Sequence, residues 1–135
     1  MTVDPKSSKI IRVPTTLDSA LFKYWFQFLQ PFHHLTDREM QVAGEYVWMR
    51  YKILHTEQVN GDVEKADAAM QKEEIRAMIR KAADVTPAHY QVILGKLRKA
   101  KVLDGNSLNP KFMPNIVEDE GIFKLLLVFD FRNTK

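Results

Sequence analysis

Basic side chains are concentrated between residues 76 and 101, and their chemistry is that of phosphate binding. Seven of them stand there against the single acid Asp84: Arg76, Arg80, Lys81, Lys96, Arg98, Lys99 and Lys101. Such a local excess suits contacts with the phosphates of a nucleic acid, although Lys and Arg on an outer helix face also serve simply to keep a protein soluble. The net charge is only +3, so the composition permits nucleic-acid binding without requiring it.

The helix expected over residues 87–100 would carry any sequence-specific DNA contact. Its groove residues would be His89, Gln91 and Lys99, and its phosphate contacts Lys96, Arg98 and Lys101. The tip is otherwise small and partly apolar, which fits poorly with base readout, because sequence readers usually present Arg, Asn, Gln or Lys there. A mid-helix glycine such as Gly95 costs about 1 kcal/mol relative to alanine, and a closely packed partner would explain it. Val92 and Gly95 are therefore candidate protein contacts.

Catalytic and metal-binding chemistry finds little support in the chain. The four histidines lack the i, i+4 spacing of a helical zinc site and stand beside no obvious nucleophile: His33, His34, His55 and His89. The chain has no cysteine, which excludes thiolate ligands and disulfides, and no glycine-rich phosphate loop. We therefore expect a protein that is not an enzyme and holds neither a metal nor a cofactor.

Helical spacing places the basic residues on two helices joined by a tight turn. One apolar stripe precedes the turn and a second follows it, and we expect them to pack on each other: Ile75, Met78, Ile79 and Ala82, then Tyr90, Ile93, Leu94 and Leu97. Asp84, Val85 and Thr86 form the turn, with Thr86 as the N-cap and Pro87 at the first helical position. This is the spacing of a helix-turn-helix.

The elements on either side complete a winged-helix arrangement. A helix beginning at the capping box of Thr36 and Glu39 is apolar on two sides, so we expect it to be central. Residues 62–83 are compatible with one helix or with two. Residues 122–131 alternate as a strand does, and we expect residues 111–117 to pair with them across an acidic turn at 118–121. The predicted fold is mainly α with a C-terminal β-hairpin, and the acidic tip of this wing would be repelled by phosphate.

The N-terminal part should contact neighbouring subunits. We divide the chain into an extended arm over 1–17, an aromatic helix over 18–34 that is capped by Asp18 and stops at Pro31, the winged-helix domain over 35–131, and a tail over 132–135. Aromatic residues surround the short helix, so one domain face cannot bury them all. The interface candidates in this part are Ile10, Ile11, Phe22, Trp25, Phe26 and Phe28.

Several segments of the chain resemble two groups of known proteins. The segments LTDREM (35–40), QVILGKLRK (91–99) and NPKFMP (109–114), with the closing LLLVFDF, resemble small proteins of crAss-like phages. Residues 79–103 are similar to the winged-helix repressor superfamily, with Asp84 where that pattern usually has glycine. The first resemblance implies a virion component, such as a ring subunit between portal and tail, or a phage-encoded regulator.

Our first hypothesis is a structural protein of a phage particle that assembles into a homo-oligomeric ring or a multi-protein complex. The alternative is a DNA-binding transcription regulator that uses the helix at 87–100. The opening residues lack the basic start and apolar run of a signal peptide, and no apolar stretch is long enough to span a bilayer. We therefore expect the protein in the virion or in the host cytoplasm, neither secreted by a signal peptide nor embedded in a membrane.

Overall fold

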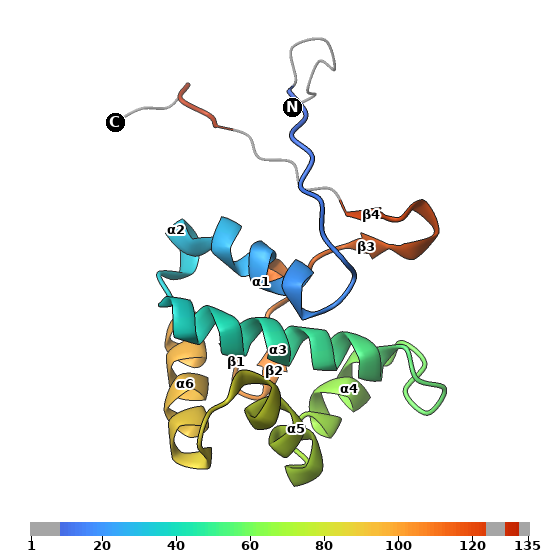
Figure 1. Cartoon of the computed structure of the whole chain (residues 1–135), viewed down its shortest axis with the longest axis vertical. Coiled ribbons are helices and arrows are strands. Elements are labelled where there is room, and N and C mark those ends of the chain that lie inside the picture. The colour runs from blue at the N-terminus through green and yellow to red at the C-terminus, as the bar shows by residue number, and fades with distance from the viewer. Residues whose placement is uncertain (1–8, 124–128, 133–135) are drawn as a thin grey trace.

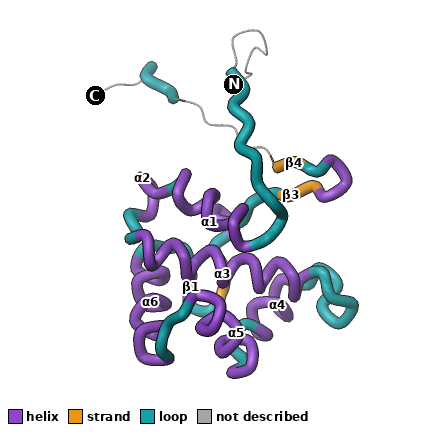
Figure 2. The backbone as a smooth tube through the Cα atoms, viewed as in Figure 1, coloured by secondary structure: helices purple, strands orange, loops and turns teal. Residues whose placement is uncertain are grey.

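The structure is mainly helical and ends in two small antiparallel hairpins. A computed structural model describes residues 9–123 and 129–132 (Figures 1 and 2). Its helices in order are α1 (Ser19–Phe28), α2 (Gln30–His33), α3 (Asp37–Leu54), α4 (Val63–Ala69), α5 (Glu73–Ala83) and α6 (Pro87–Lys99). Strand β1 (Leu103–Asp104) pairs with β2 (Ser107–Leu108), and β3 (Ile116–Val117) pairs with β4 (Ile122–Phe123). Two 3-10 turns, η1 (Pro110–Phe112) and η2 (Glu118–Glu120), flank β3.

Helix α3 is the centre of the molecule, as its two apolar sides predict. Helices α1 and α2 lie on one side of it, and α4, α5 and α6 lie on the other (Figure 1). The predicted capping box starts the helix: the Glu39 N–H donates to Thr36 Oγ1 at 3.2 Å, and the Thr36 N–H donates to Glu39 Oε1 at 3.0 Å. Its buried residues are Met40, Val42, Ala43, Gly44, Tyr46, Val47 and Arg50.

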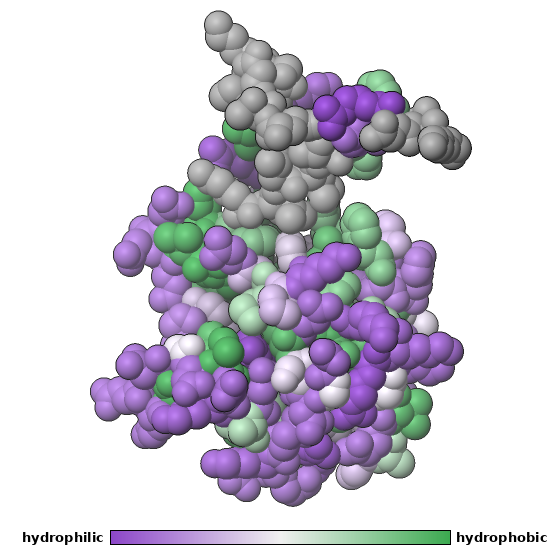
Figure 3. Space-filling view, turned by 180° about the vertical axis from the view of Figure 1, so that it is seen from behind, coloured by the Kyte–Doolittle hydropathy of each residue, from purple (hydrophilic) through white to green (hydrophobic). Residues whose placement is uncertain are grey.

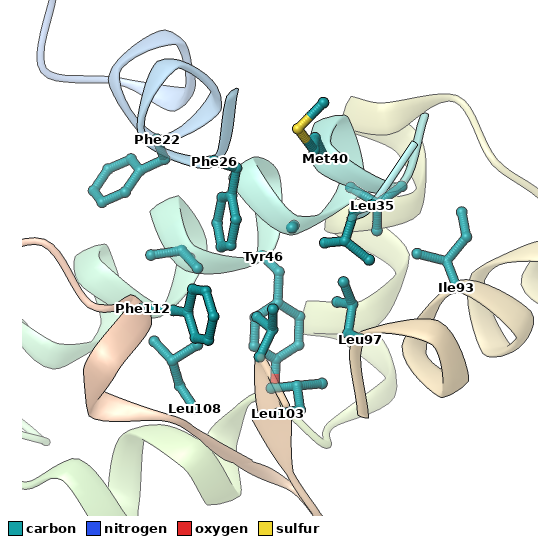
Figure 4. Close-up of a cluster of buried hydrophobic side chains, with 14 of the residues drawn as sticks. Phe22, Phe26, Leu35, Met40, Tyr46, Ile93, Leu97, Leu103, Leu108 and Phe112 are labelled. Carbon is teal, nitrogen blue, oxygen red and sulfur yellow. The ribbon is translucent and has the colours of Figure 1, made fainter. Parts of the chain in front are cut away.

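One hydrophobic core joins both sides of α3. Figure 4 shows Phe26 of α1, Tyr46 of α3 and Leu97 of α6 converging on Leu103 and other apolar side chains of the first hairpin. The aromatic helix therefore belongs to the same core as the rest of the chain. Each fully buried Leu or Phe stabilises this core by roughly 1.5–3 kcal/mol.

The expected helix-turn-helix is present as α5, a turn and α6. Asp84 ends α5 in the left-handed conformation, with φ 55° and ψ 57°, and Thr86 Oγ1 accepts the His89 N–H at 3.1 Å. Arg38 of α3 donates to the Asp84 carbonyl oxygen, which ties the turn to the central helix. The second predicted stripe is confirmed in full, because Tyr90, Ile93, Leu94 and Leu97 are all buried.

The first stripe is partly wrong. Ile79 is buried and Ile75 is half-buried, but Met78 is exposed, and Ala83 rather than Ala82 enters the core. The reason is that α5 and α6 both pack on α3, so the face of α5 that is buried is the one turned toward α3.

Residues 62–83 form two helices, α4 and α5. Asp62 caps α4 by accepting the N–H groups of Glu64 and Lys65 at 3.1 and 3.2 Å. A largely buried ion pair holds the short helix in place: Arg50 Nε of α3 lies 2.7 Å from Asp67 Oδ1. The same carboxylate oxygen accepts the Leu108 N–H at 3.4 Å, so one side chain joins α3, α4 and β2.

The predicted C-terminal hairpin is only partly correct. The hairpin that follows α6 is β1–β2, where no strand was predicted. The expected strand over 111–117 begins only at Ile116, because Pro110 starts a 3-10 turn and Pro114 has no N–H to donate to a ladder. Its partner strand is described over Ile122–Phe123. Residues 124–128 lie outside the described residues, and Phe129 and Phe131 are exposed and not in a strand.

The aromatic helix ends earlier than predicted. Asp18 caps it as expected, accepting the Ala20 N–H at 2.8 Å, but α1 ends at Phe28, and Pro31 lies in the first turn of α2 instead of stopping α1. Proline is tolerated there because the first N–H groups of a helix have no intrahelical partner.

His33 closes the connection between α2 and α3. Its Nδ1 accepts the Leu35 N–H at 3.0 Å, so the ring proton resides on Nε2, which donates to the Phe26 carbonyl oxygen at 2.7 Å. Burial lowers the pKa of His33, the nearby His34 lowers it further, and the Phe26 carbonyl opposes both. The folded protein therefore favours the neutral ring.

Gly44 allows α1 to approach α3 closely. A Cβ at position 44 would lie 3.1 Å from the Lys23 backbone nitrogen and 3.3 Å from the Lys23 Cα. These atoms belong to the main chain of α1 and cannot rotate away. The mid-helix glycine of α6 is different, because a Cβ at Gly95 would have no neighbour within 4 Å.

We expect Gly44→Ala and Gly95→Ala to have opposite effects on the free energy of unfolding. Gly44→Ala forces α1 away from α3 and should destabilise the protein by about 1–2 kcal/mol. Gly95→Ala, its matched control, should stabilise the protein by about 0.5–1 kcal/mol, because alanine favours the helix and meets no atom. Urea denaturation of both variants checks this, and a neutral or stabilising Gly44→Ala would contradict the close contact.

We expect the stability of the protein to fall as the pH decreases from 7 through about 6.5, the ordinary pKa of histidine. The unfolded chain takes up a proton at His33 before the folded protein does, so the stability contributed by the neutral ring is complete above that pH and is lost below it. The measurement is the urea midpoint between pH 7.5 and 5. In His33→Gln this dependence should be smaller, whereas His89→Gln, at an exposed position of α6, should keep it.

Candidate interaction surfaces

Most of the exposed large apolar side chains of the described residues lie on one side of α3. They come from the arm, from α1 and α2, and from β3 and β4, which lie together above α3 in Figure 1. We call this surface the apolar end: Ile10, Ile11, Val13, Leu17, Tyr24, Phe28, Phe32, Val117 and Ile122. Seen from behind, hydrophobic residues gather in the upper half of the molecule, whereas the lower half, with α4, α5 and α6, is mainly hydrophilic (Figure 3).

Three of the predicted interface aromatics do not belong to this surface. Phe22, Trp25 and Phe26 are buried, because one face of α1 packs on α3 and Phe112 and Phe123 cover a second face. Trp25 Nε1 donates to the Phe112 carbonyl oxygen at 2.7 Å, and the Trp25 ring meets Phe123 edge to face with centroids 5.1 Å apart. Their prediction as subunit contacts is therefore wrong for the folded chain.

The outer face of α1 and α2 still exposes aromatic rings. Phe28, which we predicted as a contact residue, is 55% exposed. Tyr24, four residues before it, and Phe32, four residues after it, are exposed as well. Tyr24 and Phe32 are contact candidates that the sequence prediction does not include. Helical spacing offers the signal, since Tyr24 and Phe28 are four residues apart and share one face.

The arm is extended and projects from the apolar end. Its described residues form no helix or strand, and Ile11, a predicted contact residue, is 88% exposed. Ile10 and Val13 are exposed as well. The arm enters α1 through Thr16, whose Oγ1 donates to the Asp18 carboxylate at 2.6 Å.

The β3–β4 hairpin has one covered face and one open face. Ile116 pairs with Phe123 and Val117 pairs with Ile122. Phe123 faces Trp25 and Ile116 packs on the core, while Val117 and Ile122 are exposed, as the alternation of strands requires. This outward pair is absent from the contact residues predicted from the sequence.

The acidic turn of this hairpin is anchored to α3. Tyr51 donates its hydroxyl proton to Glu118 Oε1. Burial, and next the Glu118 hydrogen bond, raise the pKa of Tyr51 to about 12, so the hydroxyl stays a donor at neutral pH. Glu118, Asp119 and Glu120 are exposed. The turn therefore lies across α3 from most of α6 (Figure 1).

The outer face of α6 presents most of the predicted DNA-contact residues. We call it the α6 face, and its exposed residues are His89, Gln91, Val92, Gly95, Lys96, Lys99 and, just beyond the helix, Lys101. Arg98 is different, because it is half-buried and its Nε donates to the Gly105 carbonyl oxygen at 3.0 Å. This bond turns the arginine toward the β1–β2 turn.

Two other basic residues of the cluster also bond within the chain. Arg80 pairs with Glu73, which lowers the pKa of that carboxyl group through their hydrogen bond, and Arg76 Nη2 donates to Gln71 Oε1 at 2.6 Å. The exposed positive charge of this region therefore belongs mainly to lysines: Lys81, Lys96, Lys99 and Lys101.

Among the described residues, the His, Asp and Glu side chains form no group of three that could hold a metal ion. No helix in the described part of the chain is long and apolar enough to cross a membrane. The chain matches no protein-family model, no curated protein and no solved structure.

Proposed function

We propose that the chain is a non-enzymatic structural subunit of a multi-subunit assembly, built on a winged-helix-like core. The observation that carries this proposal is the apolar end. Monomeric proteins seldom expose contiguous apolar patches larger than a few hundred Å², and larger patches mark sites of protein contact. Here nine large apolar residues from the arm, α1, α2 and β3–β4 share one end of the molecule.

The layering of the fold supports the same proposal. In this proposal, helices α3, α5 and α6 with hairpin β1–β2 take the roles of the three helices and the wing of a winged helix. The arm, α1, α2 and β3–β4 are additions, and they lie on the side of α3 opposite α5. They bury one flank of α3 and expose new apolar surface, which is what a subunit-binding layer requires.

The resemblance to proteins of crAss-like phages makes a virion ring or a connector between portal and tail the first candidate assembly. A projecting arm suits such a ring, because the arm of one subunit can contact a different surface on the next subunit. Contacts of this heterologous kind close into a ring when the rotation between neighbours permits.

We expect Phe28→Ser to weaken self-association of the purified chain and Met78→Ser to leave it unchanged. The two side chains have nearly the same exposed fraction, 55% and 53%, but Phe28 belongs to the apolar end and Met78 to α5. Truncating a central apolar contact costs about 1–2 kcal/mol, or roughly a fivefold to thirtyfold loss of affinity. Sedimentation equilibrium measures the effect.

A monomeric unmodified chain, or equal effects of the two substitutions, would contradict this role of the apolar end. Mass spectrometry of purified particles tests the phage assignment separately. The chain should be present in a fixed copy number, and its absence would remove the virion from the proposal.

A second candidate function, DNA binding, is favoured by the position of the acidic turn. The turn does not accompany the exposed lysines of the α6 face, so it does not repel phosphate there. His89 and Gln91 lie at the start of α6, where a groove-binding helix places its readers. Gly95 and Val92 leave little hydrogen-bonding capacity for the rest of a base-specific contact.

If the α6 face binds duplex DNA, the combined variant Lys96→Ala, Lys99→Ala should weaken that binding and flatten its salt dependence. Each phosphate contact that is lost lowers the slope of log K against log salt by about 0.9. Lys23→Ala, at an exposed position of α1, is the matched control and should not change the slope. A flat dependence for the unmodified chain would rule out this second function.

A further inference from the structure

We propose that the arm of one copy of the chain lies along the outer face of the β3–β4 hairpin of a second copy. This inference rests on the self-assembly proposed above and identifies two surfaces that meet. Within one chain, no hydrogen bond between described residues joins the arm to the hairpin. Both segments are therefore available to another copy.

The hairpin offers an apolar site of limited width. Val117 and Ile122 lie directly opposite each other on its outward face and are 43% and 40% exposed. The inward pair is held against α1 by Trp25, so the hairpin is supported from behind. In the described residues, β3 and β4 pair only with each other.

The arm has the side chains that this site requires. In an extended segment, alternate residues share a face, so Lys9, Ile11 and Val13 point to one side. When Ile11 covers the Val117–Ile122 pair, Lys9 lies two residues further along, about 7 Å away. That distance brings its ammonium group next to the acidic turn when the arm runs toward it.

Charge complementarity selects a second copy of this chain as the occupant. The described arm carries Lys9 and Arg12 and no acid before Asp18, whereas the turn carries Glu118, Asp119 and Glu120. Like charges would oppose the contact between two hairpins or between two arms. The pairing of arm with hairpin joins different surfaces of successive subunits, as a ring requires.

Disulfide trapping tests the contact directly, because the natural chain has no cysteine. Ile11→Cys and Val117→Cys are introduced into separate full-length chains, which are mixed at equal concentration under mild oxidation. A disulfide requires Cβ atoms about 3.5–4.5 Å apart, so it forms efficiently only if the two positions meet. The control pairs Ile11→Cys with Val63→Cys, which is 48% exposed on α4 below α3.

We expect the mixed disulfide of the Ile11→Cys and Val117→Cys chains to form several-fold faster than that of the control pair. Equal rates would overturn the inference. A chain carrying both substitutions distinguishes docking within one copy from docking between two copies. A dominant internal disulfide in dilute solution would also overturn the inference. The oligomeric mass of the unmodified chain is measured first. A monomer rejects the assembly itself, while an oligomer with trapping at the control level rejects only the arm contact.

Charge reversal provides a second test that needs no cysteine. Lys9→Glu and Glu120→Lys should each weaken self-association by roughly two- to fivefold, the range of exposed ion pairs. The chain that carries both reversals should regain most of the affinity. Additive losses in the double variant would show that the two positions do not meet and would overturn the inference.

Discussion

Helix α3 has apolar side chains on two opposite sides, and the rest of the structure depends on covering both. Helices α5 and α6 cover one side and α1 covers the other. On the α5–α6 side, large side chains such as Tyr46, Ile93 and Leu97 fill the space, whereas on the α1 side Gly44 lets two backbones approach closely. The two layers also separate two kinds of surface, because the first presents lysines and the second presents aromatic and aliphatic side chains.

Polar groups inside the core determine how the outer elements attach to α3. The largely buried Arg50–Asp67 pair joins α4 and β2 to the central helix, and the Trp25 indole joins α1 to the segment that follows the first hairpin. Removing one partner of such an ion pair or hydrogen bond lowers the stability of the fold by more than the intact pair contributes to it. The reason is that the remaining polar group stays buried without a partner. These bonds therefore favour one arrangement of the layers over others with similar apolar burial.

Local sequence signals determined the elements of this protein. The capping box at Thr36 and Glu39, the Asp18 cap and the Thr86–Pro87 start of α6 all depend on residues close together in the chain, so they could be predicted. The periodicity of α6 identified its buried face for the same reason. The β1–β2 hairpin was harder to find, because two-residue strands carry almost no alternation.

Only the tertiary structure decided which of the predicted contact residues are exposed to solvent and which are buried. An aromatic helix gives no local sign of which rings will be covered, and the partners of Trp25 are Phe112 and Phe123, far along the chain. The same holds for Arg98, which the β1–β2 turn engages, and for the acidic turn, which Tyr51 holds across α3 from most of α6. Burial and charge placement are set by contacts between distant residues, whereas helices and caps are set by neighbours.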